Sequence, residues 1–281
     1  RQRINLDGQR FVGSVGWRQN EQTFDAIRAE AKAGPFSFDG SYAIRQRTLF
    51  GVDAGPRTAY AGKFWLLGAG AVLGPVNLKG FAYLLDYDPA FLFASSSASY
   101  GLRATTALPL AEKVNLNLAG SYARQRDHGQ NPVRYAADYF AGEASLAVRG
   151  LTLTGGYEQL GSDGKAANGL GRAVQTPMAT AHKFNGWADL FATTPDRGLR
   201  DLYAGAAYRF DGVKALPGLN AAVTWHRFDS AAHSIDYGRE WDASLGFRIR
   251  RVAILAKYAD YKAHGFGADT RKFWLQAEFG Y

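Results

Sequence analysis

A two-residue alternation of apolar and polar side chains recurs along the whole chain and constrains its fold more than any other feature. Successive side chains of a β-strand point to opposite faces, so this period is typical of strands with one apolar face. In EWDASLGFRIR (240–250), for example, Leu245 and Ile249 share the face opposite Asp242 and Arg248. Segments of this kind predict roughly thirteen strands. They lie at 22–33, 35–47, 62–73, 75–87, 97–108, 113–122, 136–149, 151–158, 200–210, 219–227, 240–250, 252–262 and 270–281.

The connections between these segments alternate between short and long. Short ones lie at 33–36, 73–76, 148–151 and 248–253, and long polar ones at 45–63, 124–134 and 159–200. An up-and-down meander with short turns at one end and long loops at the other has this pattern, as transmembrane barrels do. Sandwiches and propellers connect their strands in other ways, and no repeat of propeller length is present. The pattern therefore favours a barrel.

The segments also have the length that a membrane requires. Eleven residues at about 3.3 Å each, tilted by about 40°, rise about 28 Å, close to the hydrocarbon thickness of a bilayer. No stretch of 18 consecutive apolar residues occurs, which excludes a membrane-spanning helix. We therefore predict an all-β, transmembrane, up-and-down antiparallel β-barrel with short periplasmic turns and long extracellular loops. Lipid requires such a sheet to close, because an open edge leaves backbone groups without partners.

The last segment, RKFWLQAEFGY (271–281), is amphipathic and ends on an aromatic residue. Its apolar face is expected to meet lipid, with Tyr281 at the periplasmic interface. Such an ending resembles the insertion signal that the barrel-assembly machinery of the outer membrane reads. The alternative is the edge strand of a soluble barrel or sandwich that binds acidic ligands.

Charge and composition limit the function. The net charge of +8 and the pI of about 9.6 favour acidic partners. Cysteine is absent, so disulfides, zinc–thiolate sites and thiol nucleophiles are excluded. No apolar leader segment is visible in the opening RQRINLDGQR, so a leader has been removed or the chain starts inside a longer product. The cations alternate with wall positions instead of forming a groove-reading patch, which argues against nucleic-acid binding.

If the apolar face meets lipid, the other face lines a pore. Strand parity assigns eleven cations and six anions to that face: Arg28, Glu30, Lys32, Asp39, Arg45, Arg47, Lys79, Arg103, Glu143, Arg149, Glu158, Arg209, Asp242, Arg248, Arg250, Lys257 and Glu278. Such an excess attracts anions, and guanidinium groups suit carboxylates and phosphates. The predicted pore-lining residues are Arg28, Glu30, Arg45, Arg103, Arg209, Asp242, Arg248 and Lys257. The alternative for any single arginine is a cross-strand ion pair that holds the wall together. Trp274 and Tyr203 also point inward by parity, and they either stack on a sugar ring or pack against an inward loop.

Catalytic motifs are scarce. The five histidines lie mostly in loops and lack metal spacing such as HExxH, so we predict no metal, cofactor or catalytic residue. The enzymatic alternative is an outer-membrane barrel hydrolase acting on lipid or peptide. It would use His226 with Ser244 and Asp242 on the following strand.

Two stretches of the sequence resemble a known family. In residues 1–28 the similarity rests on Arg1-Gln2, Arg10-Phe11, Gly13, Trp17-Arg18, Thr23-Phe24-Asp25 and Arg28. In residues 176–203 it rests on Phe184-Asn185-Gly186-Trp187-Ala188-Asp189 and Gly198-Leu199-Arg200-Asp201-Leu202-Tyr203. Both stretches are similar to the alginate-export-type family of proteobacterial outer-membrane porins.

The resemblance implies a monomeric barrel of about eighteen strands with a basic lumen. The resemblance further implies that the chain is one transmembrane domain (1–281) that lacks the first strands of the barrel. Residues 1–4 would then be the end of a strand whose earlier part is missing. About fourteen strands would then lie in this chain. Residues 5–21 and 159–200 become long extracellular or lumen-folded loops.

The function expected from the sequence is that of an outer-membrane porin of a Gram-negative bacterium. It would pass small, anionic solutes, such as uronates or other acidic oligosaccharides, by passive diffusion. The expected surroundings are outer-membrane lipid and lipopolysaccharide.

Overall fold

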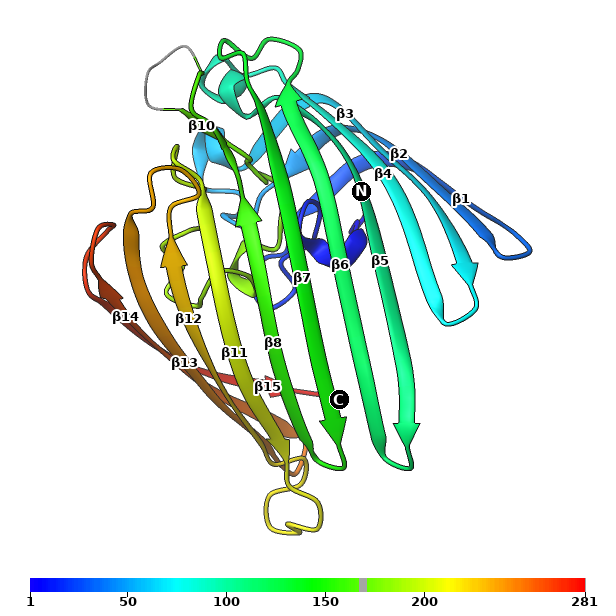
Figure 1. The fold of residues 1–281 in the computed structure, drawn as a ribbon, viewed down its shortest axis with the longest axis vertical. Helices are drawn as coiled ribbons and strands as arrows, with labels where there is room; N and C mark the ends of the chain where they lie inside the picture. The colour runs from blue at the N-terminus through cyan, green and yellow to red at the C-terminus, as the bar shows by residue number, and fades with distance from the viewer. Residues whose placement is uncertain (167–170, 281) are drawn as a thin grey trace.

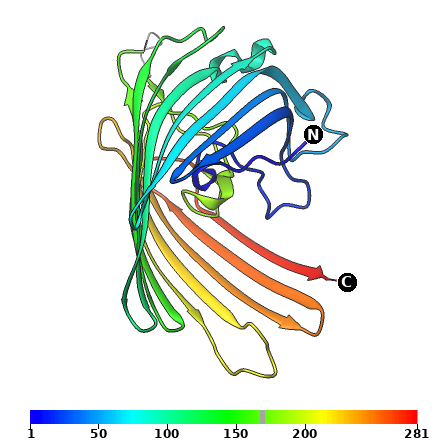
Figure 2. The ribbon, with the colours of Figure 1, turned by 90° about the vertical axis from the view of Figure 1, so that its right-hand side faces the viewer.

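The computed structural model describes residues 1–166 and 171–280 and has one large antiparallel sheet (Figures 1 and 2). Thirteen strands follow one another in chain order, and each pairs with its sequence neighbours. They are β1 (Thr23–Ala33), β2 (Phe36–Arg47), β3 (Ala59–Leu73), β4 (Val76–Tyr87), β5 (Ser97–Ala111), β6 (Val114–Asp127), β7 (Ala136–Val148), β8 (Leu151–Leu160), β11 (Leu199–Arg209), β12 (Asn220–Asp229), β13 (Asp236–Ile249), β14 (Val252–Ala263) and β15 (Thr270–Phe279). All thirteen expected segments are strands.

The remaining elements are small. The short strands β9 (Ser162–Asp163) and β10 (Arg172–Ala173) pair with each other. The described residues also contain four short 3₁₀ helices: η1 (Asp7–Gln9), η2 (Gly55–Arg57), η3 (Ala90–Ser95) and η4 (Ala181–Lys183). Gln2 forms an isolated antiparallel bridge with Phe24, so the first residues begin to pair with β1. None of the helical turns in the described residues is long and apolar enough to cross a membrane.

The two ends of the sheet differ as the spacing predicts. Two-residue turns at 34–35, 74–75, 112–113, 149–150 and 250–251 join strands at one end, the lower end of β5–β8 in Figure 1. Lys113, Arg149 and Arg250 have positive φ there, as two-residue hairpins demand. Longer connections, such as 48–58, 88–96, 128–135 and 161–198, join strands at the other end. The exception is 210–219, ten residues long at the short-turn end. Arg149 and Arg250 therefore occupy turns and not the pore wall.

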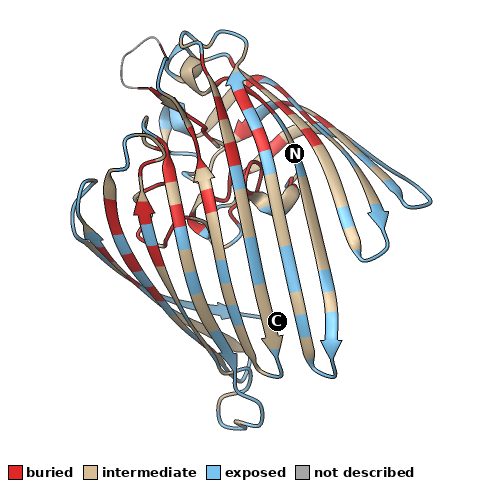
Figure 3. Cartoon of the chain, viewed as in Figure 1, coloured by how far each residue is buried: buried red, intermediate tan, exposed pale blue. Residues whose placement is uncertain are grey.

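The outer face of the sheet is apolar and uncovered. Leu245, Val223 and Phe279 are 42%, 41% and 60% exposed, so the apolar positions are not a dry core. Buried residues gather instead in the long-loop half of the molecule, on the inside of the sheet (Figure 3). Tyr281, expected at the membrane interface, lies outside the described residues.

The buried core joins loops to wall. Its loop side includes Leu6, Phe11, Val12, Met178 and Phe191, and its wall side includes Phe24, Phe64, Tyr83, Tyr139, Phe228 and Tyr261. The inner face is thus not uniformly polar, as strand parity implied. In the long-loop half it is largely aromatic, because loops fold inward and exclude water from it.

A β-bulge corrects one predicted pore residue. The register of β2 shifts between Ala43 and Arg45 against both neighbouring strands. A bulge inserts an unpaired residue, which reverses the alternation beyond it. Ala43 and Gln46 are buried on the inner face, whereas Ile44 and Arg45 are both exposed on the outer one. Arg45 therefore faces outward.

Candidate pore constriction

Residues 5–21 and 174–191 lie together on the concave side of the sheet (Figure 2). Val12 forms a parallel bridge with Met178, and the Gly13 amide donates to the Met178 carbonyl at 2.9 Å. The Thr180 hydroxyl donates to Gln9 Oε1 at 2.8 Å and accepts from the Val15 amide at 3.1 Å. The two segments thus form one body, called here the lumen plug.

Arg10 fastens the lumen plug to the wall. Its Nε donates to Glu158 Oε1 of β8 at 2.7 Å, and its two terminal nitrogens donate to Thr176 and Asn185. Tyr139 of β7 donates to the same Glu158 oxygen at 2.8 Å. Both charged groups are buried, and a guanidinium offers enough donors in one plane to serve all these partners. Strand parity could not find Arg10, because it lies in an aperiodic loop.

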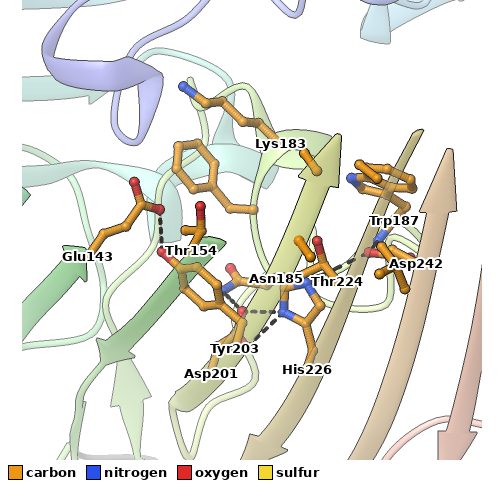
Figure 4. A pocket seen from close by; sticks show the side chains of 16 residues that line it. Glu143, Thr154, Lys183, Asn185, Trp187, Asp201, Tyr203, Thr224, His226 and Asp242 are labelled. Atoms are coloured by element: carbon orange, nitrogen blue, oxygen red, sulfur yellow. Dashed lines mark hydrogen bonds and ion pairs between the residues drawn. The ribbon is translucent and has the colours of Figure 1, made fainter. Parts of the chain in front are cut away.

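A chain of polar contacts continues from Asn185 along the wall (Figure 4). Asn185 Nδ2 donates to Glu158 Oε2 at 2.7 Å and to Asp201 Oδ2 of β11 at 3.2 Å. His226 Nδ1 of β12 lies 2.9 Å from Asp201 Oδ1, and its Nε2 lies 3.7 Å from Asp242 Oδ2 of β13. Asn185, Asp201, His226 and Asp242 border a cavity of about 300 Å³ between the lumen plug and the wall.

Backbone amides of the lumen plug also bind wall carboxylates. The Trp187 amide donates to Asp242 Oδ2 at 3.1 Å, and the Ala188 amide donates to Glu240 Oε1 at 2.6 Å. Glu240 and Asp242 are two residues apart on β13, so their side chains lie on the same, inner face of the sheet. Their carboxylates therefore meet two consecutive backbone amides of the lumen plug.

Lys257 of β14 forms a third attachment. Its Nζ donates to His182 Nε2 at 2.6 Å and lies 3.8 Å from the Trp187 ring centroid and 4.9 Å from that of Trp17. His182 stacks on Trp17 with 3.7 Å between ring centroids, and its Nδ1 lies 2.8 Å from Asp189 Oδ1. Burial lowers the pKa of His182 and outweighs the opposing effect of Asp189. We call His182, Lys257, Asp189 and the two tryptophans the clasp.

On the opposite side, η1 touches the wall through Asp7. Lys79 Nζ of β4 lies 3.2 Å from Asp7 and 2.6 Å from Asp39, and the Tyr83 hydroxyl donates to Asp7. The described attachments therefore hold the lumen plug to strands from β4 to β14.

Two cations face each other next to η1. Arg103 of β5 donates to Ser121 at 2.9 Å and borders Gly8, and Lys183 Nζ donates to the Gly8 carbonyl at 3.0 Å. Burial lowers the pKa of Lys183, and the neighbouring Arg103 lowers it further. Both line a cavity of about 120 Å³ that also contains Glu143 and Tyr203.

The predicted pore-lining residues separate into groups. Arg103, Asp242 and Lys257 point inward and meet the lumen plug. Arg28 and Glu30 pair with each other at 2.8 Å on β1. Arg209 pairs with Asp211 at the short-turn rim, and Arg248 is exposed near the same rim. The sequence does not reveal that Arg10, His182 and Lys183 join Arg103 and Lys257, because the loops that carry them have no periodicity.

The inward aromatic residues pack on protein groups. Trp274 lies edge-on to Trp17, with 6.1 Å between ring centroids, and the Tyr203 hydroxyl donates to Glu143 at 2.6 Å. Trp274 therefore packs against an inward loop, which was one of the two expectations for these rings.

The hydrolase alternative is not supported by the orientation of His226. A general base must face its nucleophile. Both ring nitrogens of His226 face carboxylates, Asp201 on one side and Asp242 on the other, and not Ser244.

Comparisons with known proteins agree with the fold. No family model matches the chain, and no curated protein matches it. Solved structures of Pseudomonas aeruginosa proteins do match. OpdO (OccK3) superposes with a TM-score of 0.72 at 15% identity, over 98% of this chain and 75% of that chain.

Two further matches have similar values. OpdK, solved with vanillate, has a TM-score of 0.67 at 15% identity, over 92% of this chain and 68% of that chain. OpdL has a TM-score of 0.65 at 17% identity, over 92% of this chain and 73% of that chain. At these identities the similarity concerns the fold, and the alginate-export family stays a prediction. The chain has the transmembrane β-barrel fold of bacterial outer-membrane porins, and its apolar outer face fits that membrane.

Proposed function

We propose that the protein is an outer-membrane channel that passes small anionic solutes by passive diffusion around the lumen plug. The observation that carries the proposal is the arrangement of the wall. Its outer face is apolar and uncovered, and its inner face binds a folded plug through polar and charged groups. A plug fixed inside a barrel narrows the pore, and the charged groups that line the remaining space favour one sign of solute.

The proposed preference for anions rests on the cations that border the space beside the lumen plug. A cavity of about 680 Å³ there is bordered by Arg3, Lys183 and Lys257, with Glu21 as the carboxylate. Arg103 adds a further cation behind Lys183. Vanillate, present in the OpdK structure, is an aromatic carboxylate, and uronates and acidic oligosaccharides carry the same group. Guanidinium and ammonium groups bind carboxylates well.

The functional barrel also needs its edges covered. β1 and β15 are the two ends of the sheet and do not pair with each other in the described residues. Unpaired backbone groups are not tolerated in lipid. We therefore infer that further strands pair with these edges to complete a monomeric barrel, and that β15 is the strand recognised by the barrel-assembly machinery.

The test is reversal-potential measurement in planar bilayers under a KCl gradient. The protein is expected to conduct with chloride preferred over potassium. The double variant Arg103→Gln with Lys183→Gln should reduce the permeability ratio by about two- to tenfold, because local charge concentrates the counter-ion.

Arg45→Gln is the matched control. It removes one positive charge from the outer face, so the permeability ratio should not change, and each single variant, Arg103→Gln or Lys183→Gln, is compared with it. Cation preference in the unaltered protein would refute the anionic part of the proposal, and absence of any conductance would refute the channel.

A further inference from the structure

We propose that His182 is an acid-sensitive latch: protonation of its imidazole opens the clasp and loosens residues 186–189 from β13–β15, so that the pore fluctuates. The inference rests on the proposed function as a channel, because its main measurement is conductance.

The geometry of the clasp requires a neutral histidine. The Lys257 ammonium has only donors, so His182 Nε2 must accept at 2.6 Å and carry no proton. The proton of the neutral ring is then on Nδ1, which donates to Asp189 at 2.8 Å. A second proton would place an N–H of an imidazolium directly against the ammonium group.

The surroundings do not compensate for that added charge. The facing charged groups are Asp189 on the same loop, Arg18 in residues 5–21, Lys257 on β14 and Lys272 on β15. Asp189 already lies 3.6 Å from Arg18 and 3.8 Å from Lys272. Beyond Lys257, Asp242 on β13 is the next carboxylate, and it accepts from the Trp187 amide.

The aromatic rings of the clasp cannot stabilise the added charge on His182 either, because they already contact the Lys257 ammonium group. Trp17 and Trp187 already face the Lys257 ammonium at 4.9 and 3.8 Å. The buried imidazole therefore gains a proton most easily when the clasp has opened, and its lowered pKa agrees with this.

The direction of the pH effect follows from linkage. An unperturbed histidine titrates near pH ~6.5, and a lowered value in the closed clasp means that the open form binds the proton more tightly. The clasp therefore has its full stability above pH ~6.5 and loses stability progressively as the pH falls below that value.

Opening of the clasp affects a defined part of the lumen plug. The amides of Trp187 and Ala188 donate to Asp242 and Glu240, so they report on whether this segment remains docked. Arg10 holds the plug independently on β8, so loosening on the β13–β15 side leaves the plug in the barrel.

The experiment compares single-channel recordings at about pH 7.5 and about pH 5.5, on either side of the ordinary histidine pKa. The unaltered protein should show about tenfold more frequent transitions between conductance levels at the lower pH. In His182→Gln, one amide atom can accept from Lys257 and the other can donate to Asp189, without titration. This variant should show the same low frequency at both pH values.

His264→Gln is the control, because His264 is an exposed histidine paired with Asp236 outside the clasp. It should respond to acid as the unaltered protein does. Hydrogen exchange of the Trp187 and Ala188 amides, corrected for intrinsic pH dependence, should accelerate at low pH in all forms except His182→Gln.

An acid response that persists in His182→Gln, or one that is absent from the unaltered protein, would overturn the latch. A protein that does not conduct contradicts the proposed channel instead, and hydrogen exchange then still decides the latch.

Discussion

Arg10 shows how single residues outside the strands organise the interior. It is 6% exposed, and its partner Glu158 is 5% exposed, although 148 positions separate them in the chain. Neither group has water as an alternative partner, so each depends on the other.

Replacing Arg10 by Met should therefore destabilise the protein by about 3–5 kcal/mol, because Glu158 is left buried and unpaired. Equilibrium urea unfolding in lipid vesicles, followed by tryptophan fluorescence, measures this. Arg10→Met combined with Glu158→Gln should recover much of the loss, since no isolated charge remains.

Arg124→Met is the control for a lost arginine, because its pair with Asp138 at 3.0 Å is exposed. It should unfold as the unaltered protein does. If Arg124→Met lowered the free energy of unfolding as much as Arg10→Met does, burial of the ion pair would not be the cause of the destabilisation.

At the scale of the strand, alternation separates lipid from lumen at every second residue. β12 shows this near its centre, where Val223 is 41% exposed on the apolar outer face and Thr224 lies on the inner face with His226, whose ring meets Asp201 (Figure 4). The bulge in β2 shows that one inserted residue is enough to exchange the two faces.

Val223→Arg should lower the free energy of unfolding by about 2–4 kcal/mol, because it places a charge at the lipid face near the middle of a strand. Thr224→Arg, one residue away, should cost much less, since it points into the barrel. The same unfolding measurement applies, and equal losses for the two variants would contradict the assignment of the faces.

At the scale of the whole molecule, two loops far apart in sequence join to make the lumen plug. Gly13 lies at their contact, where a Cβ atom would overlap the Thr180 hydroxyl and crowd Gln9 Cβ at 2.7 Å. The absence of a side chain at this position lets the loops approach each other.

Gly13→Val should force the loops apart at a cost of about 1–3 kcal/mol, as overpacking does. Hydrogen exchange at Gly13 and Val15, whose amides bind Met178 and Thr180, should become faster. Gly16→Val in the same loop is the control, because a Cβ there meets nothing closer than Glu21 at 4.0 Å. Unchanged protection in Gly13→Val would show that the loops do not depend on this contact.

The extent to which the sequence predicts this protein depends on where a residue lies. The positions of the thirteen strands and the alternation of turns and loops follow from period and spacing. Parity places Arg103, Asp242 and Lys257 on the inner face, where they meet the lumen plug, because regular strands repeat every two residues; that they line a conducting pore stays a prediction. Arg45 was assigned to the wrong face, because a bulge leaves no mark in an apolar–polar pattern.

The sequence by itself determined the sheet, because each strand of a lipid-facing wall must carry apolar side chains at every second position over the thickness of the bilayer. Only the tertiary structure decided what fills the barrel and which cations meet there. Arg10 with Glu158, and His182 with Lys257, are brought together by loop folding, and contacts between aperiodic segments distant in the chain follow no local rule.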